Sequence, residues 1–101
     1  MNRHDYSLIP DYTLRALKGW VTEAKPTGGF LRSVLRNDLK RAVGAADNVN
    51  LAALPQIVCF IFNHIPQACW GSPSKVVFWP ERLEEFRAKG LDIDGFWKHG
   101  K

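Results

Sequence analysis

The chain has 101 residues, of which 46% are hydrophobic and 24% charged, and it carries a formal net charge of +4. This length and composition are typical of one globular domain with its own hydrophobic core, and they exclude a low-complexity chain. Two cysteines are too few for a disulfide scaffold. We therefore expect residues 1–101 to form a single small domain.

The longest apolar-rich run, residues 51–65, is shorter than the about 20 residues that a helix needs to cross a bilayer, and polar side chains interrupt it. Residues 1–6 lack the apolar core of a signal peptide. The sequence therefore predicts no membrane contact and a cytoplasmic location.

The first helix is expected over residues 11–24, after an extended N-terminal arm of residues 1–9. Its apolar positions follow the spacing of one helix face: Leu14, Leu17, Val21 and Ala24. The run KPTGG at residues 25–29 then predicts a turn, because proline and paired glycines stop a helix.

The second expected helix runs from Gly29 to Val43, with Gly44 as its stop. An apolar stripe at helical spacing supports this helix: Leu31, Val34, Leu35, Leu39, Ala42 and Val43. We expect the stripe, leucines included, to face the core.

Positive charge gathers on the same segment, opposed by a single acidic residue. On a continuous helix, Arg32, Arg36 and Lys40 would form one slanted ridge, because every fourth residue advances only about 40° around the axis. Lys25 and Arg41 would lie near the two ends of this ridge. Such a ridge fits phosphates or an acidic protein surface. The succession of a helix, a glycine-containing turn and a basic helix also resembles a DNA-binding helix-turn-helix motif.

A third helix is expected from Asp47 or Asn48 to residue 65, where Pro66 ends it. Its apolar residues surround nearly the whole helix: Leu51, Leu54, Ile57, Val58, Phe60, Ile61, Phe62 and Ile65. This pattern predicts that the helix is the central, most buried element. Pro55 lacks an amide hydrogen and is expected to kink the helix or to mark a restart.

A serine cap and a proline at residues 72–73 predict the start of a fourth helix. Pro80 is expected to end this helix, since the residue before a proline avoids helical geometry, and to open a last helix over residues 81–89. Gly90 would cap that helix, and residues 90–101 are expected to form an irregular tail. The predicted fold is therefore all-α, with four to five helices around a central buried helix.

The cysteines raise the alternatives of catalysis and metal binding. Cys59, His64 and Cys69 are evenly spaced, but a zinc site needs about four ligands and no fourth lies nearby. A catalytic cysteine–histidine pair needs an accessible thiolate, and no nucleophile motif flanks either cysteine. We therefore expect no enzyme activity, no metal and no cofactor, with Cys59 as a small buried hydrophobe.

Three segments carry a resemblance to a known group of proteins. They read IPDYTLRAL over residues 9–17, PTGGFLRSVLRNDL over residues 26–39 and WGSP over residues 70–73. In these segments the chain resembles small proteins encoded by phages and prophages. The resemblance covers roughly two-thirds of the chain, and it ends after Trp79, where Pro80 and a longer tail follow.

The resemblance implies a bacterial host cell and a non-enzymatic protein that binds a host macromolecule, either a protein or a protein–nucleic-acid complex. Inhibitors of bacterial defence systems, such as anti-CRISPR proteins, have this size and character, which is an argument by analogy. The residues expected to bind are those of the basic ridge: Lys25, Arg32, Arg36, Lys40 and Arg41. The alternative is a nucleic-acid-binding module that uses the basic second helix.

Overall fold

Five α-helices and one 3₁₀ helix make up most of residues 6–93, the part of the chain that the computed structural model describes. They are α1 (Asp11–Glu23), α2 (Gly29–Leu35), α3 (Leu39–Ala45), α4 (Asn48–His64), the 3₁₀ helix η1 (Gln67–Cys69) and α5 (Pro73–Ala88). No strand occurs within these described residues, so the predicted all-α class is confirmed. Among the same residues, no helix has both the length and the apolar character that a membrane crossing requires.

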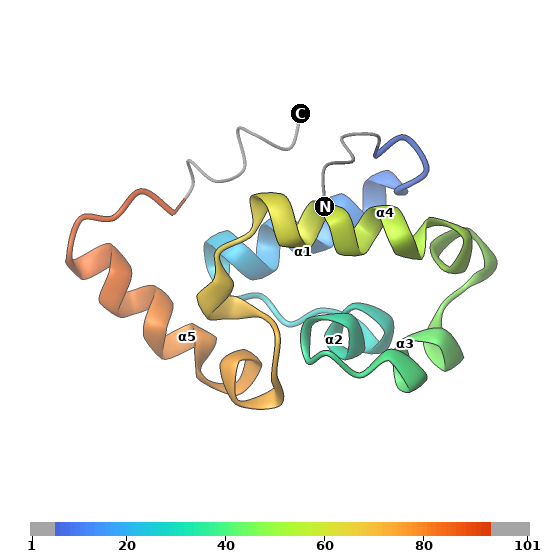
Figure 1. The fold of residues 1–101 in the computed structure, drawn as a ribbon. Helices are drawn as coiled ribbons and strands as arrows, with labels where there is room; N and C mark the ends of the chain where they lie inside the picture. The colour runs from blue at the N-terminus through green and yellow to red at the C-terminus, as the bar shows by residue number, and fades with distance from the viewer. Residues whose placement is uncertain (1–5, 94–101) are drawn as a thin grey trace.

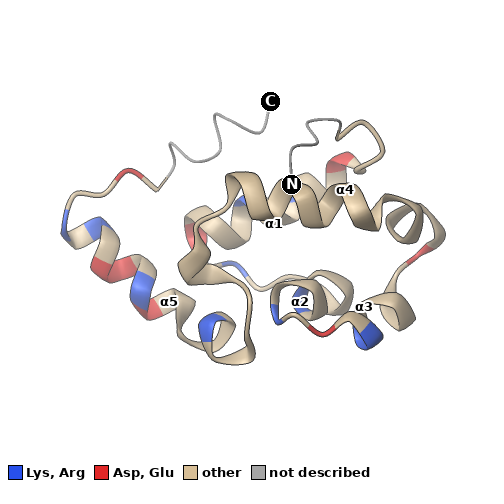
Figure 2. Cartoon of the chain, viewed as in Figure 1, with Lys and Arg blue, Asp and Glu red and all other residues tan. Residues whose placement is uncertain are grey.

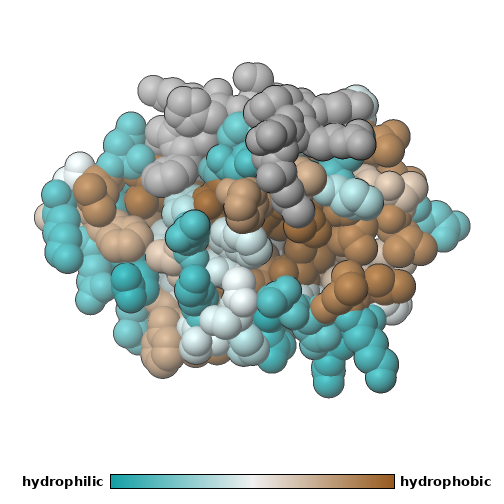
Figure 3. Space-filling model, viewed as in Figure 1, coloured by the Kyte–Doolittle hydropathy of each residue, from teal (hydrophilic) through white to brown (hydrophobic). Residues whose placement is uncertain are grey.

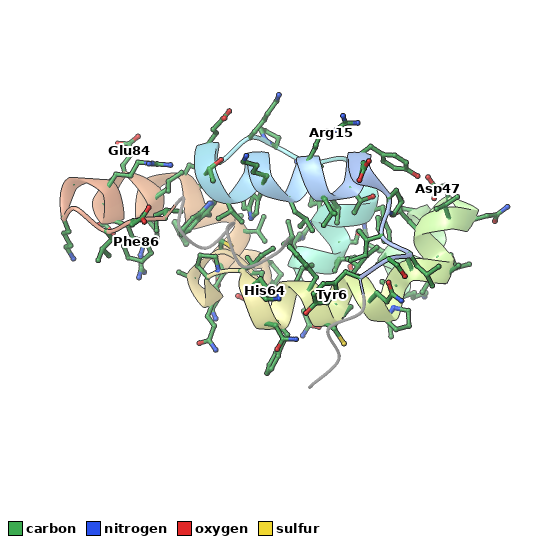
Figure 4. The ribbon with its side chains drawn as sticks, turned by 90° about the horizontal axis from the view of Figure 1, so that it is seen from above. Tyr6, Arg15, Asp47, His64, Glu84 and Phe86 are labelled. Carbon is green, nitrogen blue, oxygen red and sulfur yellow. The ribbon has the colours of Figure 1, made fainter. Side chains whose placement is uncertain are left out.

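Helices α1 and α4 lie side by side and run in the same direction (Figures 1 and 4). Two polar contacts join their N-terminal ends. The Thr13 hydroxyl donates to Asn50 Oδ1 at 2.7 Å, and the Tyr12 hydroxyl donates to Asp47 Oδ2 at 2.7 Å. Asp47 also caps α4, because its side chain accepts the Asn50 amide hydrogen. The predicted cap of this helix is therefore confirmed, and it also ties α4 to α1.

The core lies where α1, α2, α4 and α5 meet, and its largest fully buried side chains come from all of these helices and η1: Leu17, Val21, Leu35, Ile57, Phe60, Ile61, Cys69 and Trp79. Helix α4 contributes three of them and is central, as predicted. It is not buried all round, however, because Leu51 and Phe62 are 42% and 52% exposed. One side of this apolar helix therefore faces solvent.

The second predicted helix is wrong in its length, because the structure breaks it into α2 and α3. Asn37 adopts the left-handed conformation with φ 64°, which asparagine tolerates better than most residues. The Asn37 and Asp38 amides donate to the carbonyls of Val34 and Ser33, a Schellman termination. Asp38 then caps α3 by accepting the Arg41 amide hydrogen.

The break changes the surroundings of the residues that follow it. Leu39, expected in the core, is 66% exposed, and Val43 is 44% exposed. Gly44, the predicted stop, lies inside α3, which ends at Ala45. The single basic ridge is lost as well, because Arg36 and Lys40 no longer share a continuous helix.

Pro80 does not divide α5, so the prediction of two short helices is also wrong. Trp79, the residue before the proline, is helical and fully buried. Its indole N–H donates to the Trp20 carbonyl of α1 at 2.9 Å. This packing outweighs the local cost of a proline within the helix. Both ends of α5 agree with the sequence: Ser72 caps the start, and Gly90 follows the last turn with φ 79°.

Pro55 lies within α4 without dividing it, so the alternative of a restart is not realised. The amide hydrogen that proline lacks would have been donated to the Leu51 carbonyl, one turn earlier. Pro55 and Leu51 are both exposed, so water can solvate the unpaired carbonyl.

The predicted N-terminal arm is not extended in its described part. The Ile9 amide donates to the Tyr6 carbonyl and closes a turn, and Ile9 is buried. The Tyr6 ring packs edge-on against Phe60 with ring centroids 5.2 Å apart. These contacts cover one flank of α4. Residues 94–101 of the predicted tail lie outside the described residues.

Ile57→Asp is expected to unfold the protein. Ile57 is 0% exposed, and an unpaired carboxylate in the core costs several kcal/mol. Val58→Asp is the matched control, because Val58 is only half-buried and a carboxylate there can reach water. Urea denaturation followed by circular dichroism compares the two variants. Equal stabilities would contradict this assignment of the core.

Candidate binding cleft

The structure divides the five predicted binding residues into two groups. Lys25 lies in the connection between α1 and α2, Arg32 lies on α2, and Arg36 caps the C-terminal end of α2. Lys40 and Arg41 lie on α3, beyond the left-handed turn. Figure 2 shows the basic positions of α3 apart from those of α2, with an acidic position between them.

The group on α3 is a solvated pair next to an acidic residue. Arg41 Nε lies 3.3 Å from Asp38 Oδ2, and the two side chains are 78% and 37% exposed. An ion pair this exposed contributes at most about 1 kcal/mol, and it partly neutralises the local charge. Lys40 beside it is exposed. Neither Lys40 nor Arg41 lines the cleft that Arg32 and Arg36 border.

The group on α2 borders a cleft of about 380 Å³ that lies between α2, α5 and the connection from α1. Its lining is mostly apolar: Trp20, Ala24, Pro26, Thr27, Leu35, Val76, Val77 and Pro80, with Arg32 and Arg36. The two arginines are therefore the charged residues of the cleft, and no acidic side chain lines it. We call this site the arginine cleft.

The burial of one side of helix α2 determines where its arginines lie. Phe30, Leu31 and Leu35 are buried in the core, which fixes the rotation of this short helix. Arg32 is left exposed and Arg36 is half-buried at the end. Neither guanidinium forms an ion pair with an acidic side chain of residues 6–93. Both are thus available to an anionic group from outside.

Backbone and indole hydrogen bonds hold the walls of the cleft together. The Gly71 amide donates to the Leu35 carbonyl at 2.7 Å, which joins α2 to the segment before α5. Trp79 donates to the Trp20 carbonyl, and the Trp20 indole donates to the Cys69 carbonyl at 3.1 Å. The spacing between the two arginines and the α5 wall is therefore set by the fold.

Lys25 is close to the cleft in sequence but does not line it. A Cβ built on Gly19 would lie 3.5 Å from Lys25 Cδ, so the aliphatic part of the lysine covers this glycine of α1. Of the five predicted residues, the structure thus brings Arg32 and Arg36 together in the lining of the cleft, whereas Lys25 lies against Gly19 of α1.

Sequence reasoning missed the α5 wall of the cleft. In the sequence, Val76 and Val77 belong to a short apolar run before Trp79, and Pro80 predicts a helix boundary. No local pattern could place them opposite Arg32, because their positions depend on Trp79 packing against α1.

The cysteines and the histidine are used in packing. The Cys69 thiol is buried and donates to the Pro66 carbonyl, and burial raises its pKa to about 12. His64 Nε2 lies 3.1 Å from the Tyr6 hydroxyl, and the two side chains point toward one another (Figure 4). Within residues 6–93, no three His, Cys, Asp or Glu side chains gather where they could hold a metal ion. Cys59, expected to be buried, is partly exposed.

A thiol-reactive reagent at pH 8 is expected to modify Cys59 in the native protein and to leave Cys69 unmodified. The raised pKa keeps the Cys69 thiol protonated, and burial blocks access. In the unfolded chain the Cys69 thiol ionises near its ordinary pKa of 9.0, whereas in the folded chain it stays protonated up to about pH 12. The free energy of unfolding therefore falls as the pH rises from about 9 towards 12. Mass spectrometry counts the modified thiols, and rapid double labelling without denaturant would contradict the buried position.

Comparisons with protein-family models, curated proteins and solved structures give no match to this chain.

Proposed function

We propose that this chain is a non-enzymatic binding protein, and that it holds an acidic segment of a bacterial host protein in the arginine cleft. The observation that carries the proposal is the pair Arg32 and Arg36, which line an apolar cleft without acidic neighbours in its lining. Planar guanidinium groups bind carboxylates in pairs, and the apolar lining can take the aliphatic part of the same segment.

The shape of α2 favours a protein partner over duplex DNA. A recognition helix lies in the major groove with an exposed face. Helix α2 has only seven residues, and four of them are buried: Phe30, Leu31, Ser33 and Leu35. The basic residues of α3 do not continue this helix, because the Asn37 turn separates α2 from α3.

The bacterial setting rests on the resemblance to phage- and prophage-encoded proteins over residues 9–17, 26–39 and 70–73. The proposal places the chain in the host cytoplasm, where a small binder with no reaction of its own would work by blocking a surface of its target. Inhibition of a bacterial defence system is one form of this function, and we include it in the proposal by analogy.

A capture experiment tests the proposal. The parent chain, the Arg32→Glu/Arg36→Glu variant and the Lys40→Glu/Arg41→Glu variant are immobilised, and bacterial lysate is passed over each, with and without nuclease. We expect a host protein on the parent and on the α3 variant, and its loss from the cleft variant. A protein retained equally by all three would contradict the arginine cleft as the binding site.

Nuclease and salt distinguish the alternative of a nucleic-acid-binding module. Binding to phosphates loses affinity log-linearly with salt, by a slope of about 0.9 for each phosphate contacted on a duplex. Captured material that disappears with nuclease, together with a steep slope, would favour the nucleic-acid alternative over the protein partner.

A further inference from the structure

A second basic site borders α5, and we call it the α5 pocket. It has a volume of about 220 Å³ and is lined by one residue of η1 and four of α5: Ala68, Ser74, Lys75, Phe78 and Arg82. No acidic side chain of the described residues lines it. By contrast, the groove between α3 and α4 has Asp38 and no basic residue in its lining. Helix α5 is thus a wall of two sites that each carry two basic residues.

The arginine cleft and the α5 pocket lie on opposite sides of α5. Each takes a row of α5 residues spaced four apart: Val76 and Pro80 for the arginine cleft, and Ser74, Phe78 and Arg82 for the α5 pocket. The two rows are offset by two residues, which is about 200° around the helix axis. Val77 lies between them on the solvent side, and the buried Trp79 lies between them on the core side. The path from one site to the other therefore crosses Val77.

The ridge between the two sites is apolar and exposed. Val77 and its neighbour Phe78 are 68% and 53% exposed. Figure 3 shows hydrophobic and hydrophilic residues interleaved over α5, whereas hydrophobic residues gather over α4. An exposed apolar centre with charged residues around it is the composition of a protein-binding surface.

Both basic residues of the α5 pocket can bind an anion. A Cβ built on Gly71 would lie 3.8 Å from Lys75 Nζ, which places this ammonium group beside the start of α5. No acidic side chain of residues 6–93 forms an ion pair with Lys75. Arg82 Nε lies 3.5 Å from Glu85 Oε1, but both side chains are more than half exposed. An ion pair this exposed is weak, so Arg82 can exchange Glu85 for the carboxylate of a partner.

We infer that the acidic segment proposed for the arginine cleft continues over Val77 into the α5 pocket. The inference rests on the proposed function and deepens it, because the segment then carries two acidic groups, one for each site. Half a turn around a helix of about 10–12 Å diameter is about 17 Å, and an extended chain covers about 3.3–3.6 Å per residue. About five residues therefore separate the two acidic groups. Apolar side chains among these five lie on Val77 and Phe78.

The lining favours an acidic peptide over single-stranded nucleic acid. Proteins that bind single strands stack successive bases on aromatic side chains. Phe78 is the exposed ring of the two sites, because Trp20 is only 5% exposed. The other apolar residues that line the two sites are aliphatic, and they fit aliphatic side chains of a peptide better than a row of bases.

Peptides selected from a displayed library of random 16-residue sequences on the full chain test the inference. We expect the selected peptides to carry two acidic groups about five residues apart with apolar residues between them. Fluorescence anisotropy of the labelled peptides measures their affinity. Lys75→Glu is expected to weaken binding about ten-fold or more, because a carboxylate of the peptide loses its cation. Phe78→Ser should weaken it as well, and shortening the five-residue spacer to two residues should have the same effect.

Lys89→Glu is the matched control, because it makes the same charge change beyond the other end of α5, outside both sites. It should bind the peptides like the parent, and circular dichroism verifies that every variant is folded. Peptides that lose affinity with Arg32→Glu/Arg36→Glu but not with Lys75→Glu or Phe78→Ser would overturn the inference and leave the proposed function intact.

Two further outcomes are decisive. Peptides that are insensitive to the arginine variant as well, or a selection without acidic peptides, would overturn both the inference and the proposed function. A labelled oligothymidylate that binds more tightly than the peptides, with a salt slope of about 0.7 for each phosphate contacted, would replace the acidic segment by a single-stranded nucleic acid.

Discussion

Reversing the charges of Arg32 and Arg36 together is expected to weaken binding of the host partner by about 1000-fold, since each arginine in the centre of an interface contributes about 2 kcal/mol. The melting temperature should stay nearly unchanged, because neither guanidinium has an ion pair to lose within residues 6–93. Isothermal titration calorimetry with the captured partner measures the affinity, and differential scanning calorimetry measures the stability.

The matched control reverses the same number of charges on α3. Lys40→Glu/Arg41→Glu changes the net charge of the chain equally but leaves the arginine cleft intact. We expect a loss of no more than a few-fold, from the weaker long-range attraction. Equal losses in the two variants would mean that the net charge alone determines binding, and the arginine cleft would then have no specific role.

Trp79→Ala is expected to destabilise the protein strongly. Trp79 is fully buried, packs against Phe86 and bonds the Trp20 carbonyl. Removing a buried tryptophan side chain costs about 3–5 kcal/mol, a large part of the 5–15 kcal/mol that stabilises a typical domain. We expect the urea midpoint to fall sharply or the chain to be unfolded in buffer.

Trp79→Phe separates packing from the hydrogen bond. The phenyl ring keeps most of the apolar contact but removes the indole donor. The Trp20 carbonyl still accepts the Ala24 amide hydrogen, so the cost is that of one lost hydrogen bond, about 0.5–1.5 kcal/mol. An intermediate stability is therefore expected. If Trp79→Ala were as stable as the parent, α5 would not be anchored to α1 through this residue, and the α5 wall of the arginine cleft would lose its support.

Local sequence patterns were sufficient to predict the helix ends that are determined by adjacent residues. Three such features depend on a few adjacent residues: the Asp47 cap of α4, the Ser72 cap of α5 and the left-handed Gly90. Capping side chains and glycines act over three or four positions, so the sequence displays them directly. The all-α class followed from the same short-range periodicity.

The helix boundaries that were predicted wrongly, at Asn37 and Pro80, depend on competition between local and distant contacts. The apolar spacing from Leu31 to Val43 permits one helix, yet the turn at Asn37 and the cap at Asp38 end it locally. Pro80 shows the reverse case, since a distant contact of Trp79 preserves a helix that the proline alone would interrupt. The arginine cleft depends on the early end of α2 and on the continuation of α5 through Pro80, because it lies between these two helices. This is why two of its residues could be predicted and its shape could not.

The hydrogen bonds of Trp20 and Trp79 give this protein its own optical reporter. Both indoles are buried and donate to backbone carbonyls, and Trp20 also lines the arginine cleft. An indole in such a position emits at shorter wavelength than one in water, and its emission responds to a charge or a dipole brought nearby. Occupation of the cleft should therefore change the intrinsic fluorescence without any label, and unfolding should shift the same emission to the red.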